Sequence, residues 1–287
     1  MRLATIHTEG GLRAVRVEGD RAIETGHPDV GALLSEPDLQ TAAFEAVGRS
    51  HDWGEVDLAP VIPAPGKILC IGVNYRAHIM EMGRDIPEYP TIFAKYTEAL
   101  IGPNDEIALP SESSAVDWEA ELALVIGRPI RRATEEQAIS AIAGFTIMND
   151  VSMRDWQYRT LQWVQGKSFE SSTPLGPVLV TPDELRGHTR PTLDLTCKID
   201  GETVQSANTS DLVFDPVDAV RYMSTFVTLR PGDVIATGTP GGVGQARKPP
   251  RYLTDGIVMV TEIEGIGRLV NTARTERWEA LDLNRGL

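Results

Sequence analysis

Three acidic residues lie in, or at the end of, apolar segments of the sequence. Glu119 and Glu121 stand two apart in VDWEAELALVIG, so the alternation of a β-strand directs both carboxylates to the same face. Asp150 ends a second apolar segment, GFTIMND. Because neighbouring like charges repel, such a face is either open to water or holds a cation. Hard oxygen donors without His or Cys beside them suit Mg²⁺, Mn²⁺ or Ca²⁺ rather than zinc, and we predict a divalent metal site here.

A basic and an amide side chain follow Asp150 at helical spacing. Arg154 and Gln157 are four and seven residues further on, so a helix that begins at Asp150 would place all three on one face. Beside a metal, an arginine and a glutamine are suited to binding a substrate carboxylate. A surface salt bridge with an exposed amide is the alternative interpretation.

The segment NYRAHIMEMG predicts a short helix that carries a candidate base. Asn74 is a possible N-cap and Gly83 a possible stop, and His78 and Glu81 share one face between them at i and i+3. A carboxylate beside an imidazole orients its tautomer and raises its basicity, as a general base for water requires. An ion pair on the helix surface is the alternative.

Lys167 and a glycine-rich run complete the polar candidates. Lys167, in QGKSFESSTPLGP, is predicted in a loop, where it is either solvated or, near a metal and a substrate carbonyl, able to stabilise an oxyanion. The run TGTPGGVG over 237–244 lacks the GK[ST] of a phosphate loop and the spacing of a dinucleotide fingerprint, so it does not support ATP or NAD binding. It is either a plain turn or a close backbone approach to a small ligand, with the hydroxyls of Thr237 and Thr239 beside it.

The acidic excess of the chain argues against two classes of partner. Its 287 residues carry 41 acidic and 27 basic side chains, a formal charge of −14. Because nucleic acids and anionic membranes are bound through Lys and Arg, we expect neither as a partner. The first residues lack the apolar core of a signal peptide and no run approaches ~18 apolar residues, which predicts a soluble, cytoplasmic protein. Cys70 and Cys197 lie in apolar runs and are expected to be reduced core residues.

Short strands must position these side chains. Residues 1–25 predict a small antiparallel hairpin and 36–48 a helix, and the segment APVIPAPG is typical of a linker. We therefore predict a small N-terminal β/α domain over 1–63 and a catalytic domain over 64–287. In the second domain the predicted strands are 68–73, 91–94, 119–127, 144–150, 176–180, 193–199, 233–238 and 257–263, and the predicted helices are 135–143, the stretch after Asp150, and 216–227 with Asp215 as its cap. Because strands follow one another without alternating helices, we predict a mostly β, α+β fold rather than a doubly wound parallel sheet.

Taken in order, these motifs resemble the fumarylacetoacetate hydrolase family. The resemblance is carried by IGVNYRAHIMEMG, IFAK, VDWEAELALVIG, GFTIMNDVSMRDWQ, QGKSFESSTPLGP, LRPGDVIATGTPGGVG and ARKPP, which together span nearly all of residues 64–270. It implies the family's mixed β-roll with few short helices, and a homodimer. It also implies these roles: Mg²⁺ or Mn²⁺ on Glu119, Glu121 and Asp150, a water-activating dyad of His78 and Glu81 on a lid helix, charge stabilisation by Lys167, and substrate contacts from Arg154, Gln157 and Thr239.

Two departures from the family pattern narrow the resemblance. Fumarylacetoacetate hydrolases proper carry a further metal-binding aspartate just before the histidine, where this chain has Asn74. The resemblance thus implies three protein ligands, and it places the chain with the shorter branch of acylpyruvate hydrolases and 2-hydroxyhepta-2,4-diene-1,7-dioate isomerases. Many relatives have proline after the lysine of IFAK, where this chain has Tyr96.

The leading hypothesis for function is metal-dependent hydrolysis of a C–C bond in an acylpyruvate or related 2,4-dioxo acid. Glu81 would orient His78, His78 would deprotonate a water that attacks the distal carbonyl, and Lys167 would stabilise the oxyanion, while the metal would stabilise the departing pyruvate enolate. Oxaloacetate decarboxylation, and isomerisation or decarboxylation of hydroxymuconate-type catabolites, use the same enolate and are the alternatives. A non-catalytic metal- or ligand-binding protein is a third. For an enzyme of either class, the expected partner is a small anionic 2-oxo acid.

Overall fold

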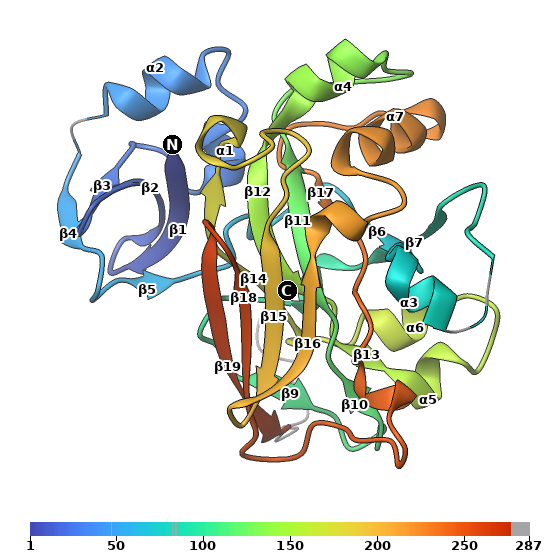
Figure 1. Ribbon diagram of the computed structural model, residues 1–287. Coiled ribbons are helices and arrows are strands. Elements are labelled where there is room, and N and C mark those ends of the chain that lie inside the picture. The colour runs from blue at the N-terminus through green and yellow to red at the C-terminus, as the bar shows by residue number, and fades with distance from the viewer. Residues whose placement is uncertain (47, 82, 84, 277–287) are drawn as a thin grey trace, which may run out of the picture.

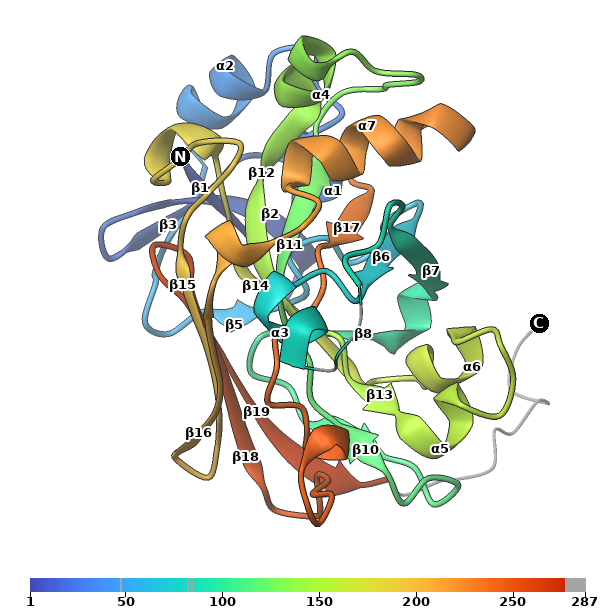
Figure 2. The ribbon, with the colours of Figure 1, turned by 45° about the vertical axis from the view of Figure 1, so that its right-hand side comes forward.

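A large, mostly antiparallel sheet forms the centre of the fold. The computed structural model describes residues 1–46, 48–81, 83 and 85–276 (Figures 1 and 2). Within these residues twelve strands form this sheet, and its parallel neighbours are β6 with β17 and β8 with β14. The path across it is β4 (Ser50–Asp52), β3 (Arg21–Glu24), β2 (Gly11–Glu18), β1 (Arg2–Thr8), β14 (Thr173–Val180), β12 (Ile142–Asn149), β11 (Ala120–Ile126), β17 (Val234–Ala236), β6 (Ile68–Gly72) and β7 (Thr91–Lys95), with β5 (Asp57–Leu58) beside β1 and β8 (Leu100–Ile101) beside β14.

The first strands extend this sheet rather than forming one of their own. β1 pairs with β2 along its whole length, and on its other side Leu3 lies opposite Leu179 of β14. The hairpin predicted over 1–25 is present as β1, β2 and β3. Two short helices follow, α1 (Val30–Leu33) and α2 (Leu39–Phe44), the second much shorter than the helix predicted over 36–48. The predicted domain boundary falls between β5 and β6, where the chain has no regular structure.

A second sheet packs on the first one. In the described part of the chain it has five strands, in the order β16 (Glu202–Asn208), β15 (Asp194–Ile199), β18 (Val258–Ile263), β19 (Gly267–Thr275) and β9 (Ile107–Leu109), and a separate two-stranded ladder joins β10 (Val116–Asp117) to β13 (Ser152–Met153). Apolar side chains of both sheets form one continuous core that includes Phe145 of β12 and Met259 of β18. The predicted mostly β fold with few, short helices is confirmed.

The remaining helices lie at the ends and edges of the sheets. They are α3 (Arg76–Glu81), α4 (Glu135–Ala141), α5 (Arg154–Gln157), α6 (Val164–Lys167) and α7 (Pro216–Phe226), with 3₁₀ turns η1 (Thr97–Ala99), η2 (Pro182–Glu184), η3 (Thr209–Asp211) and η4 (Gly244–Ala246). Asp215 caps α7 as predicted, since its carboxylate accepts two N–H groups of the first turn. The predicted helix over 135–143 ends at Ala141, because the next residue begins β12 and pairs with β11. None of the helices in the described residues is long and apolar enough to cross a membrane.

Candidate functional site

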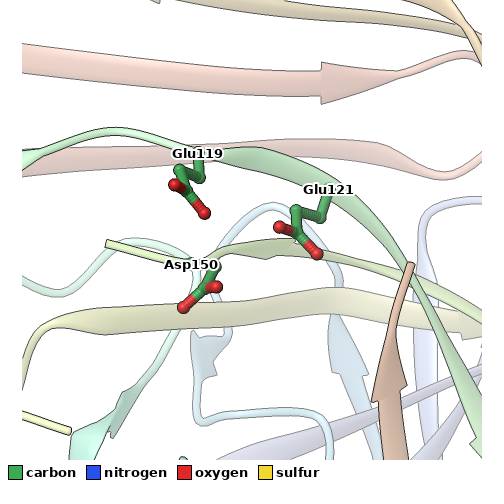
Figure 3. A group of neighbouring side chains, drawn as sticks. All are labelled: Glu119, Glu121 and Asp150. Carbon is green, nitrogen blue, oxygen red and sulfur yellow. The ribbon is translucent and has the colours of Figure 1, made fainter. Parts of the chain in front are cut away.

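The predicted metal ligands meet where β11 and β12 pair. Glu119 lies directly before β11, Glu121 is the second residue of β11, and Asp150 follows β12. Ala120 pairs with Asn149, and the N–H of Asp150 donates to the carbonyl of Glu119 at 2.8 Å. One carboxylate oxygen of each acidic side chain lies within 4.8 Å of the others, and all three residues are buried (Figure 3). We call these three residues the acid cluster.

The donor set of the acid cluster fits a hard divalent ion. Carboxylate oxygens are the ligands that Mg²⁺, Mn²⁺ and Ca²⁺ prefer. Burial, together with the charges of Asp150 and Glu119, holds the pKa of Glu121 well above its usual range. Burial would also raise the pKa of Glu119, but Lys167 and Arg154 outweigh it and lower that pKa to about 2. A bound cation would therefore lower the pKa of Glu121 and stabilise its charged form.

Lys167 lies against two carboxylates of the acid cluster. Its Nζ is 2.6 Å from Oε2 of Glu119 and 2.7 Å from Oδ2 of Asp150, and it lies 4.8 Å from the ring centre of Phe93. The expectation that Lys167 lies in a loop was wrong, because it is the last residue of the one-turn helix α6, which lies between β7 and α5 (Figure 1). Its burial and its two ion pairs exclude the solvated alternative.

A second buried lysine, which the sequence reasoning missed, contacts the acid cluster from β7. Nζ of Lys95 is 2.7 Å from Oδ1 of Asp150, so each oxygen of this carboxylate has its own ammonium. A charged residue at the end of the apolar strand TIFAK was the available signal. The next residue, Tyr96, donates its backbone N–H to Oγ of Ser168 at 3.2 Å, a bond that proline cannot make. The side chain of Tyr96 is 61% exposed.

Arg154 joins the acid cluster to a further buried carboxylate. Its Nη1 is 2.6 Å from Oε1 of Glu119 and donates to Oε1 of Gln157 at 2.9 Å, and its Nε donates to Oδ2 of Asp117 at 2.8 Å. Asp117 also accepts two backbone N–H groups of η4. No role was predicted for Asp117, although it is the second residue of the same VDWEAE segment as the glutamates. The surface alternative for Arg154 and Gln157 is excluded, because both are buried.

The helix expected after Asp150 begins four residues later than predicted. The chain first forms β13, because Ser152 and Met153 pair with β10, and only then turns into α5 at Arg154. Asp150 therefore does not share a helical face with Arg154 and Gln157, and this prediction was wrong. The spacing of three residues within α5 still accounts for the contact between the arginine and the glutamine.

The glycine-rich run donates a backbone N–H to the acid cluster. The N–H of Gly238 lies 2.7 Å from Oε2 of Glu121. The hydroxyls of Thr237 and Thr239 donate to two carbonyls of β11 at 2.9 and 3.1 Å. Because the hydroxyl proton of Thr239 is used inside the protein, this residue offers a substrate an oxygen lone pair and no proton. Its predicted contact with substrate stays a prediction.

Helix α3 is connected to the acid cluster through hydrogen bonds of the residues that precede it. Asn74, two residues before α3, donates to the carbonyls of Thr237 at 2.8 Å and Phe214 at 2.9 Å, and its Oδ1 accepts the N–H of Phe214 at 2.8 Å. Asn74 is therefore not the N-cap that was predicted. Asp211 binds the start of α3 instead, accepting the N–H of Ala77 at 3.0 Å. Since both polar atoms of the Asn74 side chain bond to the backbone, the ligand set of three carboxylates fits this departure from the family pattern.

His78 and Glu81 lie on α3 at the spacing that was predicted. His78 is half-buried, and Glu81 is the last residue of the helix. The side chain of Glu81, with residues 82 and 84, lies outside what the structure describes. The water-activating dyad therefore stays a prediction that the helical spacing supports.

The formal charges buried at the site nearly cancel. They comprise four carboxylates and three cations, which leaves one negative charge: Asp117, Glu119, Glu121 and Asp150 against Lys95, Arg154 and Lys167. A divalent ion would change the surplus to one positive charge, which favours an anionic ligand.

The comparison with protein families identifies the class. The family model described as Fumarylacetoacetate (FAA) hydrolase C-terminal matches residues 67–274, a range that includes every residue of the site. The match covers more than half of the chain, and the protein therefore belongs to the fumarylacetoacetate hydrolase family of enzymes.

Individual relatives within the family carry several activities. The chain is 45% identical over 215 residues to the mitochondrial oxaloacetate tautomerase Fahd2a of Rattus norvegicus, a match of 75% of this chain and 68% of the relative. It is similar to a crystal structure of a putative HpcE protein from Mycobacterium smegmatis, with a TM-score of 0.87, 36% identity and coverage of 96% and 100%. It is also similar to the 5-carboxymethyl-2-hydroxymuconate delta-isomerase structure from the same organism, with a TM-score of 0.81, 37% identity and the same coverage.

Proposed function

We propose that this protein is a metal-dependent enzyme that interconverts the keto and enol forms of a small 2-oxo dicarboxylic acid of the oxaloacetate type. The observation that carries the proposal is the acid cluster with its buried cations, which a divalent ion would convert from one surplus negative charge to one positive charge. The name of the rat relative, an oxaloacetate tautomerase, supports the substrate class.

The reaction needs stabilisation of a negative oxygen on the substrate. A divalent ion on Glu119, Glu121 and Asp150 would act as a Lewis acid toward that oxygen. Burial would lower the pKa of Lys167, but the carboxylates of Asp150 and Glu119 outweigh it and raise that pKa, so Nζ keeps its proton at neutral pH. Lys167 is thus a hydrogen-bond donor for the developing oxyanion. The planar guanidinium of Arg154 suits a substrate carboxylate.

The reaction also needs a group that carries a proton to and from the neighbouring carbon, and we assign this step to His78. An imidazole exchanges protons near neutral pH. Asn74 ties the start of α3 to Thr237, and the next residue, Gly238, donates to Glu121. This chain of contacts holds the start of α3 at the edge of the acid cluster.

Acylpyruvate hydrolysis is the second candidate, and the spacing of His78 and Glu81 on α3 favours it. In that reaction His78 takes a proton from water instead of carbon, and Glu81 orients the ring. Decarboxylation of oxaloacetate would use the same stabilised oxygen without a water, so the metal ligands do not separate these reactions.

Three assays on one protein preparation with Mn²⁺ test the proposal. They follow the ultraviolet absorbance of enol-oxaloacetate, the cleavage of acetylpyruvate and the release of CO₂, each against Mn²⁺ without protein. We expect the enol to disappear far faster than with metal alone and acetylpyruvate to stay intact. Cleavage of acetylpyruvate would favour the hydrolase, release of CO₂ would favour the decarboxylase, and no acceleration in any assay would contradict all three. Glu121→Gln is the matched inactive control, because it removes the charge of one ligand and keeps its shape.

A further inference from the structure

Between the two glutamates, the backbone groups at one edge of β11 bond to side chains instead of to a neighbouring strand. β17 pairs with only three residues of β11, over 123–125, before the chain leaves at the glycine-rich run. Ala120, the residue between Glu119 and Glu121, lies beyond that pairing. Because buried backbone groups are almost always hydrogen-bonded, its N–H and carbonyl need partners from elsewhere.

Gln205, on β16 of the second sheet, and Thr239 supply the hydrogen-bonding partners for Ala120 at this edge. Its Oε1 accepts the N–H of Ala120 at 3.0 Å, and the hydroxyl of Thr239 donates to the carbonyl of Ala120 at 3.1 Å. Nε2 of Gln205 donates to Oγ1 of Thr239 at 2.8 Å and to the carbonyl of Pro240 at 3.0 Å. The glutamine is 1% exposed. Two side chains thus form the hydrogen bonds that a neighbouring strand would form.

The glycine-rich run packs directly on β16 at the same place. A Cβ at Gly242 would lie 2.0 Å from the carbonyl oxygen of Val204, and the φ of Gly242 is +101°, so only glycine fits. Four residues earlier in the run, the N–H of Gly238 binds the carboxylate of Glu121. The same run therefore reaches one ligand through Gly238, and it reaches the peptide between both ligands through Thr239 and through Gln205.

We propose that Gln205 is a positioning residue for the acid cluster. By holding the peptide of Ala120, it sets the local twist of β11, and this twist fixes the separation and direction of the two glutamate carboxylates on the same strand face. It acts through the backbone and Thr239, not on the ligand oxygens. The inference rests on the proposed function, because it requires the acid cluster to bind a metal ion.

The test measures binding of Mn²⁺ to the full chain by electron paramagnetic resonance, which needs no turnover. Gln205→Met keeps the length of the side chain and removes its hydrogen bonds. We expect its Kd for Mn²⁺ to rise about tenfold, as for other residues that orient metal ligands, with an unchanged far-ultraviolet circular dichroism spectrum. Gln205→Leu removes the same hydrogen bonds without adding a charge to this buried position, so its Kd is expected to rise by a similar factor. Ser206→Ala, at the exposed neighbouring position of β16, is the matched control.

A purely structural role would lower the unfolding temperature of Gln205→Met and leave the Mn²⁺ affinity of the folded protein within about twofold of the native value, the range of a neutral surface change. That result overturns the inference, and Gln205→Leu decides in the same way if the methionine variant does not fold. A native chain that binds Mn²⁺ and responds to Gln205→Met, but converts no enol, contradicts the proposed function and leaves this inference standing. A native chain that binds no Mn²⁺ contradicts both.

Discussion

The acid cluster and helix α3, which we propose belong to the same site, are built in opposite ways. The cluster lies on paired strands, and its carboxylates contact partners from β7, α5, α6 and the glycine-rich run. Helix α3 has six residues, a length that is marginal alone, and Met80 on it is 69% exposed. The geometry for binding an ion is therefore preset by the sheet, whereas the group proposed to move protons lies on a short, partly exposed helix.

The largest effect is expected from Asp150→Asn, which removes one charge of the acid cluster and leaves α3 unchanged. The amide cannot neutralise Lys95 and Lys167, which are both buried, and breaking a buried ion pair costs about 3–5 kcal/mol. We expect a loss of this size in the free energy of unfolding, measured by denaturant titration, together with loss of Mn²⁺ binding. Asp155→Asn, on the exposed side of α5, is the control. A variant as stable as the native chain would show that the cations do not depend on this carboxylate.

Metal addition should stabilise the native chain by a somewhat smaller amount. A ligand that binds only the folded state at 100 times its Kd raises the free energy of unfolding by about 2.7 kcal/mol. We expect this increase with Mn²⁺ and its reversal by a chelator, measured by thermal denaturation. Glu121→Gln should show little of it. An equal increase in that variant would place the bound ion outside the acid cluster.

Arg154→Lys tests whether the acid cluster needs the planar set of donors of a guanidinium or only a positive charge. Lysine cannot bond Glu119, Gln157 and Asp117 together, because it lacks the planar arrangement of donors. We expect kcat/KM for the enol to fall about 100-fold, the size of losing one fixed donor to a transition state. Activity near the native value would mean that Arg154 contributes only its charge.

His78→Ala should distinguish the role of α3 from the role of the acid cluster most clearly. We expect a change of about 0.5 kcal/mol or less in the free energy of unfolding, as for a substitution near the surface, and an unchanged Kd for Mn²⁺. Turnover should fall about 100-fold or more, because a positioned proton carrier is lost. Full turnover in this variant would show that His78 does not carry the proton. Weaker Mn²⁺ binding would show that α3 contributes to the geometry of the acid cluster.

The smallest effect is expected at the two thiols, which report whether the sheet strands that carry them stay closed to solvent in the native protein. Cys70 is on β6, directly before α3, and burial raises the pKa of its thiol; burial also raises the pKa of Cys197 to about 12. We expect no alkylation of either cysteine in the native protein and full alkylation in denaturant, measured by mass spectrometry. Alkylation of Cys70 alone would show that β6 becomes accessible to solvent in the native protein.

Much of the fold and part of the site could be predicted from local patterns. Alternation and apolar runs located the strands that carry Glu119, Glu121 and Asp150, because strand position depends on nearby residues. Lys95, Asp117 and Gln205 were missed, since each acts through partners distant in the sequence: 85 residues separate Gln205 from Ala120. The homodimer, the cytoplasmic location and the absence of nucleic-acid and membrane partners stay predictions.

Two of the errors have a shared cause. Asn74 has the residue type of a helix cap, but it bonds to Phe214 and Thr237 instead. The segment after Asp150 has helical spacing, but its first residues pair with β10. In both places a hydrogen-bonding partner from a remote segment replaced the local one that the pattern assumes.

The sequence by itself determined the residue types, the spacing of two carboxylates on one strand face and the family to which the chain belongs. These follow from the period of a strand and from the order of motifs. Only the tertiary structure decided which charges surround the acid cluster. It also decided that the hydroxyl of Thr239 donates to β11 and that Gln205 of the second sheet bonds to the peptide of Ala120. Buried charges and buried backbone groups must find partners, and the packing of the two sheets determines which partners are within reach.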